Sequence, residues 1–217
     1  VIIDNMMNLD LLFTVSKWTG DNKYKDVAIK HAITTMKNHF RPDYTCWHVV
    51  SYNNDGTVER KQTHQGKNDD SSWSRGQAWA LYGYTSCYRE TNDTTFLNFA
   101  VNIADMIMER VKTDDAIPYW DYDAPVTEET PRYASAAAVT AAGFIELSTM
   151  VPDGKKYLDY AEKILKSLSS DAYLAKVGEN QGFILMHSVG SLPNGSEIDT
   201  PLNYADYYYL EALKRFM

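Results

Sequence analysis

The sequence has few cysteines and no long apolar run. Its 217 residues include two cysteines, Cys46 and Cys87. Two cysteines cannot build a disulfide framework, and their spacing matches no metal-binding motif. No stretch reaches the length of about 20 apolar residues that a membrane-spanning helix requires. The sequence therefore gives no sign of a disulfide-stapled scaffold or of a transmembrane segment.

Positive charge is also scarce. Lys and Arg number 21 against 29 Asp and Glu, so the formal net charge is −8. Nonspecific binding to nucleic acids or to membranes depends on basic patches, and we expect neither as a partner. An anionic ligand would have to be held by a few local cations, because the overall field repels it.

Several common catalytic signatures are missing. There is no glycine loop for phosphate, no serine nucleophile elbow and no cysteine–histidine signature. His48 and His64 could bind a metal together with Asp69, but their spacing matches no known ligand motif. A metal site is therefore an alternative that the spacing does not favour.

Aromatic residues, by contrast, are abundant, with 16 Tyr and 5 Trp. Three segments also share one helical pattern, in which a turn signal precedes apolar residues spaced three or four apart. In each segment an aromatic residue and an alanine stand four apart on one helix face. These pairs are Tyr24 and Ala28, Phe96 and Ala100, and Tyr157 and Ala161.

Each of these segments follows a helix of another kind. Residues 2–17, 73–89 and 134–150 are small or apolar nearly all round, and 204–216 forms a last helix of this type. A helix that is apolar all round is buried. We therefore expect a single all-α domain over residues 1–217, made of buried inner helices and amphipathic outer helices. Repeated helical hairpins stack into a solenoid or a toroid, and seven helices are too few to close a ring of six hairpins.

Long connections follow the outer helices, roughly at residues 41–72, 113–133 and 171–203. We expect them to lack regular structure, and long loops of this kind are usually functional. All three would emerge at the N-terminal ends of the inner helices, which predicts an active face at that end. Asp121 and Asp123 in the second connection could line the mouth of a site or fix a turn.

Two candidate residues stand at the start of the second inner helix. Arg75 and Trp79 are four apart and share one helix face. A guanidinium offers a bidentate partner for a carboxylate, and an indole ring offers a stacking surface. The alternative for Arg75 is a structural ion pair with Asp69 or Asp70.

Asp4 lies among apolar residues at the start of the first inner helix. Burial can raise the pKa of a carboxyl group into the range that suits a general acid. The alternative is that Asp4 caps the N-terminus of that helix.

Seven short stretches carry a family resemblance that extends, in order, over essentially the whole chain. They are IIDNMMNL at 2–9, RPD at 41–43, HVV at 48–50, THQG at 63–66, WSRGQAW at 73–79, IPYWD at 117–121 and DYYYLEAL at 206–213. Together they resemble the unsaturated glucuronyl hydrolases of glycoside hydrolase family 88.

The resemblance implies an (α/α)6 barrel, of which these seven helices would form an incomplete, C-terminal portion. It implies that Asp4 is the general acid/base and that His48, Gln65, Arg75 and Trp79 bind the substrate. Arg75 would face the uronate carboxylate, and Trp79 would stack on a sugar ring. The family has a second important aspartate upstream of the position of Asp4, which we expect in a longer protein.

The implied reaction releases a 4,5-unsaturated glucuronic acid from the non-reducing end of a glycosaminoglycan-derived oligosaccharide. It proceeds by hydration of the C4=C5 double bond, and it implies no metal and no organic cofactor. The alternatives are a related hydrolase of unsaturated rhamnogalacturonan, a noncatalytic carbohydrate-binding remnant, and another enzyme on a helical toroid, such as an epimerase or a lyase. Such enzymes occur in both cytoplasm and periplasm, so the compartment stays open.

The sequence departs from the family pattern in two places. The family usually has Arg-Asp before the alanine-rich helix, where this chain has Arg132-Tyr133. Family members that prefer sulfated substrates carry serine and lysine in the loop before the last helix. The corresponding stretch, 188–199, contains no Lys or Arg. We therefore expect a weaker dependence on sulfate.

Overall fold

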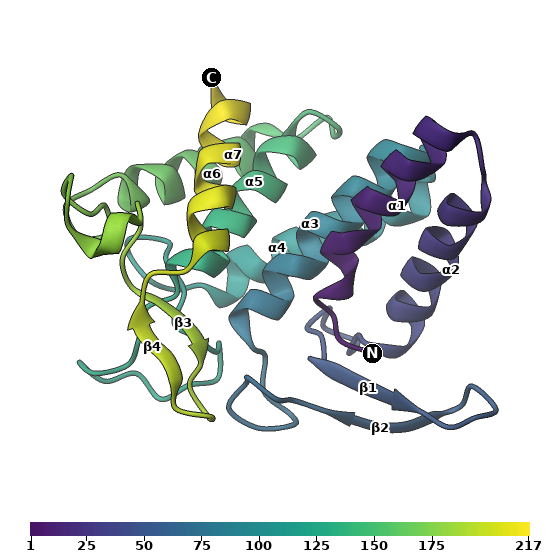
Figure 1. The fold of residues 1–217 in the computed structure, drawn as a ribbon, viewed down its shortest axis with the longest axis horizontal. Coiled ribbons are helices and arrows are strands. Elements are labelled where there is room, and N and C mark those ends of the chain that lie inside the picture. Colours follow the sequence, from purple (N-terminus) through teal and green to yellow (C-terminus); the bar gives the residue numbers. More distant parts are fainter.

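The computed structural model describes all 217 residues and confirms a predominantly helical chain with seven α-helices (Figure 1). The helices are α1 (Asn5–Thr19), α2 (Lys23–Asn38), α3 (Ser74–Thr91), α4 (Thr94–Arg110), α5 (Ala134–Ser148), α6 (Lys155–Leu168) and α7 (Asn203–Phe216). None of them is both long enough and apolar enough to cross a membrane.

The odd-numbered helices are the inner helices that the sequence predicts. Helix α5 packs against α3, α6 and α7, and α1 packs against α3. Every residue of α5 from Ala134 to Ile145 is buried, as are the first 14 residues of α3. The apolar character on all sides of α3 and α5 is thus explained, because each of them has neighbours on several sides. The expected burial is wrong for one face of α1 and of α7, where Leu11 and Trp18 of α1 and Leu210 of α7 are exposed.

The outer helices contact this layer through their small residues. Ala28 of α2, Ala100 of α4 and Ala161 of α6 are all fully buried. Small side chains at these positions let the outer helices approach closely. Phe96 and Tyr157, four residues before two of these alanines, are also buried, so the predicted pairing of aromatic and alanine marks the packed face.

The inner helices are also tied together by ion pairs far from their N-terminal ends. Arg89 at the end of α3 contacts Asp10 of α1 and Glu146 of α5. Arg215 of α7 lies 2.8 Å from the other carboxylate oxygen of Glu146 and 2.5 Å from Glu211. Four inner helices are therefore linked through two arginines and two carboxylates, Asp10 and Glu146, while Glu211 lies on the same helix as Arg215.

Two of the three long connections contain β-hairpins, so the expectation that they lack regular structure is wrong for these two. Strands β1 (Val49–Tyr52) and β2 (Val58–Gln62) pair antiparallel, as do β3 (Ser188–Ser191) and β4 (Ser196–Thr200). Gly56 and Gly195 have positive φ in the two turns, a conformation that favours glycine. Both hairpins lie on the same side of the helices in Figure 1, at the N-terminal ends of the inner ones.

The close packing of α1 on α3 predicts an asymmetric effect of alanine at two helical glycines. A Cβ atom on Gly83 would lie 2.5 Å from Met6 Cβ and 2.8 Å from Met6 O, so α1 would have to move. We expect Gly83→Ala to destabilise the intact protein by about 1–3 kcal/mol in urea unfolding.

Gly143→Ala is the matched control, because its new Cβ would mainly meet the flexible Leu81 side chain, at 3.1 Å. Its effect should stay below about 1 kcal/mol, since alanine is otherwise preferred in a helix. If the two variants lost the same free energy of unfolding, the close contact between α1 and α3 at Gly83 would be contradicted.

Candidate active site

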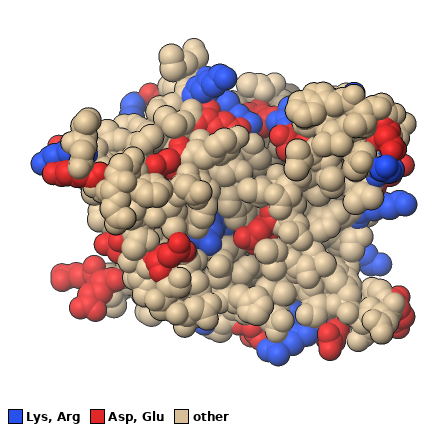
Figure 2. Space-filling view, viewed as in Figure 1, with Lys and Arg blue, Asp and Glu red and all other residues tan.

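The residues that immediately precede three inner helices converge on one region. Asp4 precedes α1, Trp73 precedes α3 and Tyr133 precedes α5. The β-hairpins bring further groups to the same end of the molecule. Figure 2 shows a basic and an acidic patch close together near the middle of this otherwise mostly uncharged face.

Arg75, in the first turn of α3, lies at the centre of this region and is only 4% exposed. Its Nη1 donates to the Tyr133 hydroxyl and, at 2.6 Å, to the Val189 carbonyl of β3. Its Nη2 donates to Gln65 Oε1 at 3.0 Å and to the Gly190 carbonyl at 3.1 Å. All four acceptors are neutral, so these bonds fix the guanidinium without balancing its charge.

Aromatic rings cover the faces of the same guanidinium. The Arg75 carbon Cζ lies 4.5 Å from the ring centroid of Trp73, 5.0 Å from that of Tyr133 and 5.1 Å from that of Tyr204. A cation over an aromatic face is favourably placed, most of all where water is excluded. Trp73 and Tyr133 thus both hold the cation and keep it dry.

The alternative in which Arg75 pairs with Asp69 or Asp70 is wrong, because Arg75 forms an ion pair with neither. Asp69 Oδ2 instead lies 2.9 Å from Arg60 Nη2, and its Oδ1 accepts from the Thr63 amide. These two bonds use both carboxylate oxygens of Asp69, the residue that was considered as a metal ligand together with His48 and His64. The structure forms no cluster of three or more His, Cys, Asp or Glu side chains that could hold a metal ion.

His48 is a buried histidine whose tautomer is set by the backbone. Its Nδ1 accepts hydrogen bonds from the amides of His64 and Gln65, at 3.2 and 3.3 Å. The hydrogen of the neutral ring therefore lies on Nε2, which faces Asp4 Oδ2 at 3.5 Å. Burial, helped by the positive charges nearby, lowers the pKa of His48 to about 3. His48 is thus a neutral donor that points at Asp4.

Asp4 does not act as a helix cap, so that alternative is wrong. Its side chain makes no capping hydrogen bond to α1, and its buried Oδ2 has no hydrogen-bond partner. Burial raises the pKa of the carboxyl group, and the positive charge of Arg75 opposes that rise. A raised pKa is what a carboxyl group needs to act as a general acid.

Trp79 lies one helical turn beyond Arg75 and is 4% exposed. The rings of Tyr204 and Tyr208 lie 6.3 and 5.2 Å from it, and its indole N–H is close enough to Asp4 to oppose the rise in the pKa of that carboxyl group. The structure therefore brings Trp79 to the site, but its ring has little open face. Stacking of Trp79 on a sugar stays a prediction.

Asp121 and Asp123 fix the loops around the site. Asp121 Oδ2 accepts from the Lys67 amide at 2.9 Å and from Ser71 Oγ at 2.7 Å. Asp123 Oδ2 accepts from the Ser72 amide at 2.8 Å. These bonds join the second long connection to the first, just before α3 begins.

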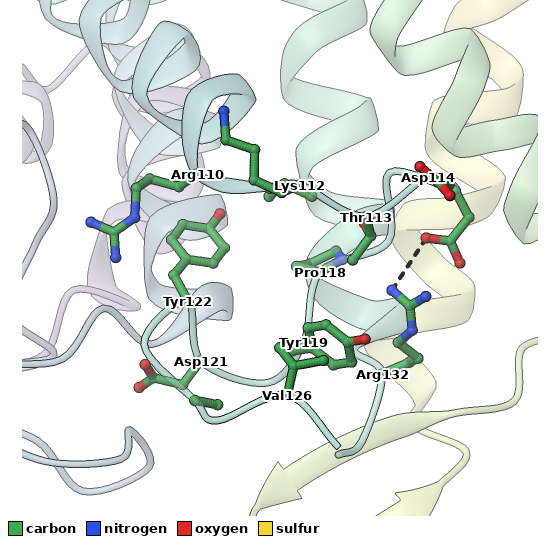
Figure 3. A pocket seen from close by; sticks show the side chains of 13 residues that line it. Arg110, Lys112, Thr113, Asp114, Pro118, Tyr119, Asp121, Tyr122, Val126 and Arg132 are labelled. Carbon is green, nitrogen blue, oxygen red and sulfur yellow. Dashed lines mark ion pairs between the residues drawn. The ribbon is translucent and has the colours of Figure 1, made fainter. Parts of the chain in front are cut away.

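A cavity of about 630 Å³ is lined by Asp121 but by none of Asp4, His48, Gln65, Arg75 and Trp79 (Figure 3). It lies at the end of α4 and along the connection that follows. Its arginines are already paired, Arg110 with Asp123 at 2.6 Å and Arg132 with Asp115 at 3.2 Å. A smaller cavity of about 490 Å³ between α1 and α7 includes Tyr204 and Tyr208 in its wall and thus adjoins the site.

Three parts of the site were not predicted from the sequence, namely Tyr133, Tyr204 and the carbonyl groups of β3. One signal could have found Tyr133: it stands directly before an inner helix, as Asp4 and Trp73 do. No local pattern marks the carbonyls, because Val189 is 114 residues away from Arg75 along the chain.

Comparisons with known proteins agree on one family. The family model described as Glycosyl Hydrolase Family 88 matches residues 3–216. An unsaturated glucuronyl hydrolase of Formosa agariphila is 50% identical over 217 residues, which are 99% of this chain and 54% of that protein. The chain thus spans about half the length of the curated relatives it matches.

Solved structures extend this likeness to the fold. An unsaturated glucuronyl hydrolase specific for heparin is 56% identical with a TM-score of 0.98, covering 100% of this chain and 59% of its own. An unsaturated glucuronyl hydrolase from Streptococcus agalactiae, complexed with dGlcA-GalNAc6S, is 32% identical with a TM-score of 0.88. That match covers 99% of this chain and 58% of the other. The seven helices therefore have the arrangement of part of an (α/α)6 barrel.

The environment of His48 predicts that its ring stays neutral over the physiological range. With a pKa lowered to about 3, His48 should show no protonation between about pH 5 and pH 8, unlike an ordinary histidine. Nitrogen NMR of histidine-labelled intact protein should show the Nε2–H tautomer throughout, with His48→Gln used to assign the signal. A titration near the ordinary histidine pKa, or an Nδ1–H tautomer, would contradict this geometry.

Proposed function

Because the chain belongs to glycosyl hydrolase family 88, we propose that its protein is an unsaturated glucuronyl hydrolase. The proposed reaction releases a 4,5-unsaturated glucuronic acid from the non-reducing end of a glycosaminoglycan-derived oligosaccharide. The observation that carries the proposal is the buried Asp4 carboxyl group, whose Oδ2 lies 3.5 Å from His48 Nε2 and whose pKa is subject to the positive charge of Arg75.

Asp4 can supply both proton transfers that the reaction requires. In its protonated form it donates a proton to C4 of the double bond, and positive charge develops at C5. The resulting Asp4 carboxylate then takes a proton from a water molecule, whose oxygen bonds to C5. The product is a hemiketal, which opens and releases the remaining sugar, so the carboxyl group ends as it began.

The neighbours of Asp4 suit this cycle. His48 donates toward the Asp4 oxygen that is unpartnered, so it can orient the carboxylate after the first transfer. Arg75 favours the carboxylate form and attracts an anionic uronate. Because Gln65 accepts from Arg75 through Oε1, its amide group is held at the site and its N–H donors are available to the sugar.

Support for a carbohydrate ligand also comes from the relatives. The Streptococcus agalactiae structure is a complex with dGlcA-GalNAc6S, and the Bacillus sp. GL1 enzyme is described as responsible for the degradation of glycosaminoglycan. We propose that Trp79 and Tyr204 line the sugar-binding side of the site, with His48, Gln65 and Arg75 binding the unsaturated uronate.

The proposed reaction destroys the C4=C5 double bond, which can be followed directly. We expect the intact protein to remove the ultraviolet absorbance of an unsaturated chondroitin disaccharide, because hydration destroys the conjugated C4=C5 bond. Asp4→Asn should slow this loss by at least about 100-fold, since general acid–base catalysis contributes factors of that order or more. Absorbance at fixed substrate concentration measures both.

Asp26→Asn is the control, since Asp26 is an exposed carboxylate in the first turn of α2, away from the site. It should keep turnover. If the intact protein leaves the absorbance unchanged, the proposed function is wrong for this substrate, and the same assay with unsaturated rhamnogalacturonan disaccharide tests the alternative hydrolase. Inactivity on both would favour a noncatalytic carbohydrate-binding protein.

The β3–β4 hairpin predicts weak dependence on sulfate. The stretch 188–199 carries Glu197 and Asp199 but no Lys or Arg, and His187 just before it already contacts Asp199 at 2.7 Å. A hydrogen bond to a charged group contributes about 1.5–3 kcal/mol. Without such a contact, kcat/KM for sulfated and unsulfated disaccharides should agree within about tenfold. A strong preference for sulfated substrates in a side-by-side assay would overturn this expectation.

A further inference from the structure

Tyr133 occupies an unusual place beside Arg75. Its side chain is fully buried at the residue before α5. Its hydroxyl oxygen accepts a hydrogen bond from Arg75 Nη1, and its ring lies 5.0 Å from the guanidinium carbon. A single side chain thus supplies both an acceptor and an aromatic face to the cation, and it does so from a different helix.

This acceptor carries no charge. Burial raises the pKa of the Tyr133 phenol well above its ordinary value, so the hydroxyl stays neutral. The other acceptors of Arg75 are an amide oxygen of Gln65 and two backbone carbonyls. Both terminal nitrogens of the guanidinium are therefore satisfied, while its full positive charge is retained inside the protein.

The charged and titratable groups around Arg75 can be followed element by element. Asp4, before α1, feels the Arg75 charge, and His48, before β1, is neutral. Tyr204 of α7 is neutral because burial raises its pKa, and it also senses Glu197 of β4. Asp4 is thus the main group on which the unbalanced charge acts within the site.

We propose that Tyr133 is a positioning residue that holds Arg75 through a neutral acceptor and so keeps its charge available for an anionic substrate. The idea rests on the proposed function and adds a determinant of specificity to it. A carboxylate at position 133 would make an equally good hydrogen bond but would form a buried ion pair, and the field of Arg75 at the substrate would fall.

An isosteric pair of variants separates charge from structure. Tyr133→Asn and Tyr133→Asp both remove the ring and leave the same space, but only the second adds a negative charge beside Arg75. Each variant is made in intact protein that also carries Asp4→Asn, so that substrate is bound without turnover. Thermal unfolding confirms that each variant is folded, and the pair Tyr133→Gln and Tyr133→Glu replaces the first pair if either member fails to fold.

The binding measurement uses two probes, an unsaturated chondroitin disaccharide and its uronate methyl ester, by titration calorimetry. We expect the Asp variant to bind the free acid at least about tenfold more weakly than the Asn variant, because a desolvated charge interaction is lost. The uncharged ester should bind both variants equally. If Tyr133 had a purely structural role, the affinities for the free acid and for the ester would change by the same factor.

A second measurement is the pH dependence of turnover for the Tyr133→Asp and Tyr133→Asn variants that keep the native Asp4. Arg75 opposes the burial-driven rise in the pKa of Asp4. A negative charge at position 133 would offset the charge of Arg75, so the pKa of Asp4 should rise. In the pH–rate profile, the Asp4 ionisation is the one that is lost in Asp4→Asn. The Asp variant should show this ionisation at higher pH than the Asn variant.

Equal affinity of the Asp and Asn variants for the free acid, with superimposable pH profiles, would overturn the role of Tyr133 and leave the proposed function standing. Failure of the protein with native Tyr133 to bind the free acid would overturn the proposed function, and this inference with it. Weaker binding that is confined to the free acid supports both.

Discussion

A desolvated guanidinium is the constraint on which the site depends. Arg75 is nearly buried at the start of α3, and an arginine without acceptors in such a place would be strongly destabilising. Its acceptors come from the connection after β2, from the residue before α5 and from β3. The cation therefore couples three parts of the chain that the packing of the helices alone would not bring into register. The ion pairs of Arg89 and Arg215 join the inner helices at a distance from the site, so α3 and its neighbours are held at both ends.

The same cation gives the site its electrostatic character. Asp4 experiences two opposing influences, since burial favours its neutral form and Arg75 favours its carboxylate. A group that must act first as an acid and then as a base benefits from such a balance. His48 adds a neutral N–H directed at the same carboxyl group, in a tautomer that two backbone amides determine.

The helices could be predicted from the sequence because their signals are local. The helical spacing of apolar residues, the turn residues and the aromatic–alanine pairs all lie within a single helix and its ends. Asp4 and Arg75 were found from their positions at helix starts, but local pattern could not decide whether Asp4 caps its helix or whether Arg75 pairs with Asp69. The structure settles both, since Asp4 makes no capping hydrogen bond and Asp69 is bound by Arg60 and the Thr63 amide. The acceptors that Arg75 does use include Val189, 114 residues away, which no local pattern could indicate. The role of Tyr133 was missed for that reason, since its partner Arg75 is 58 residues away. The hairpins were missed although their signals are local, because Asp55-Gly56 and Asn194-Gly195 are typical hairpin turns whose strands pair within 13 residues.

The most direct measurement is a crystal structure of the intact protein with Asp4→Asn, soaked with an unsaturated glycosaminoglycan disaccharide. We expect the unsaturated ring between residue 4 and Arg75, with C4 at about 3–3.5 Å from the side chain of residue 4, as a reactive arrangement requires. The uronate carboxylate should lie on the Arg75 side, and the second sugar should extend toward Tyr204. A disaccharide bound instead in the cavity beside Arg110 and Tyr119, with the region of Asp4 unoccupied, would contradict the assignment of the active site.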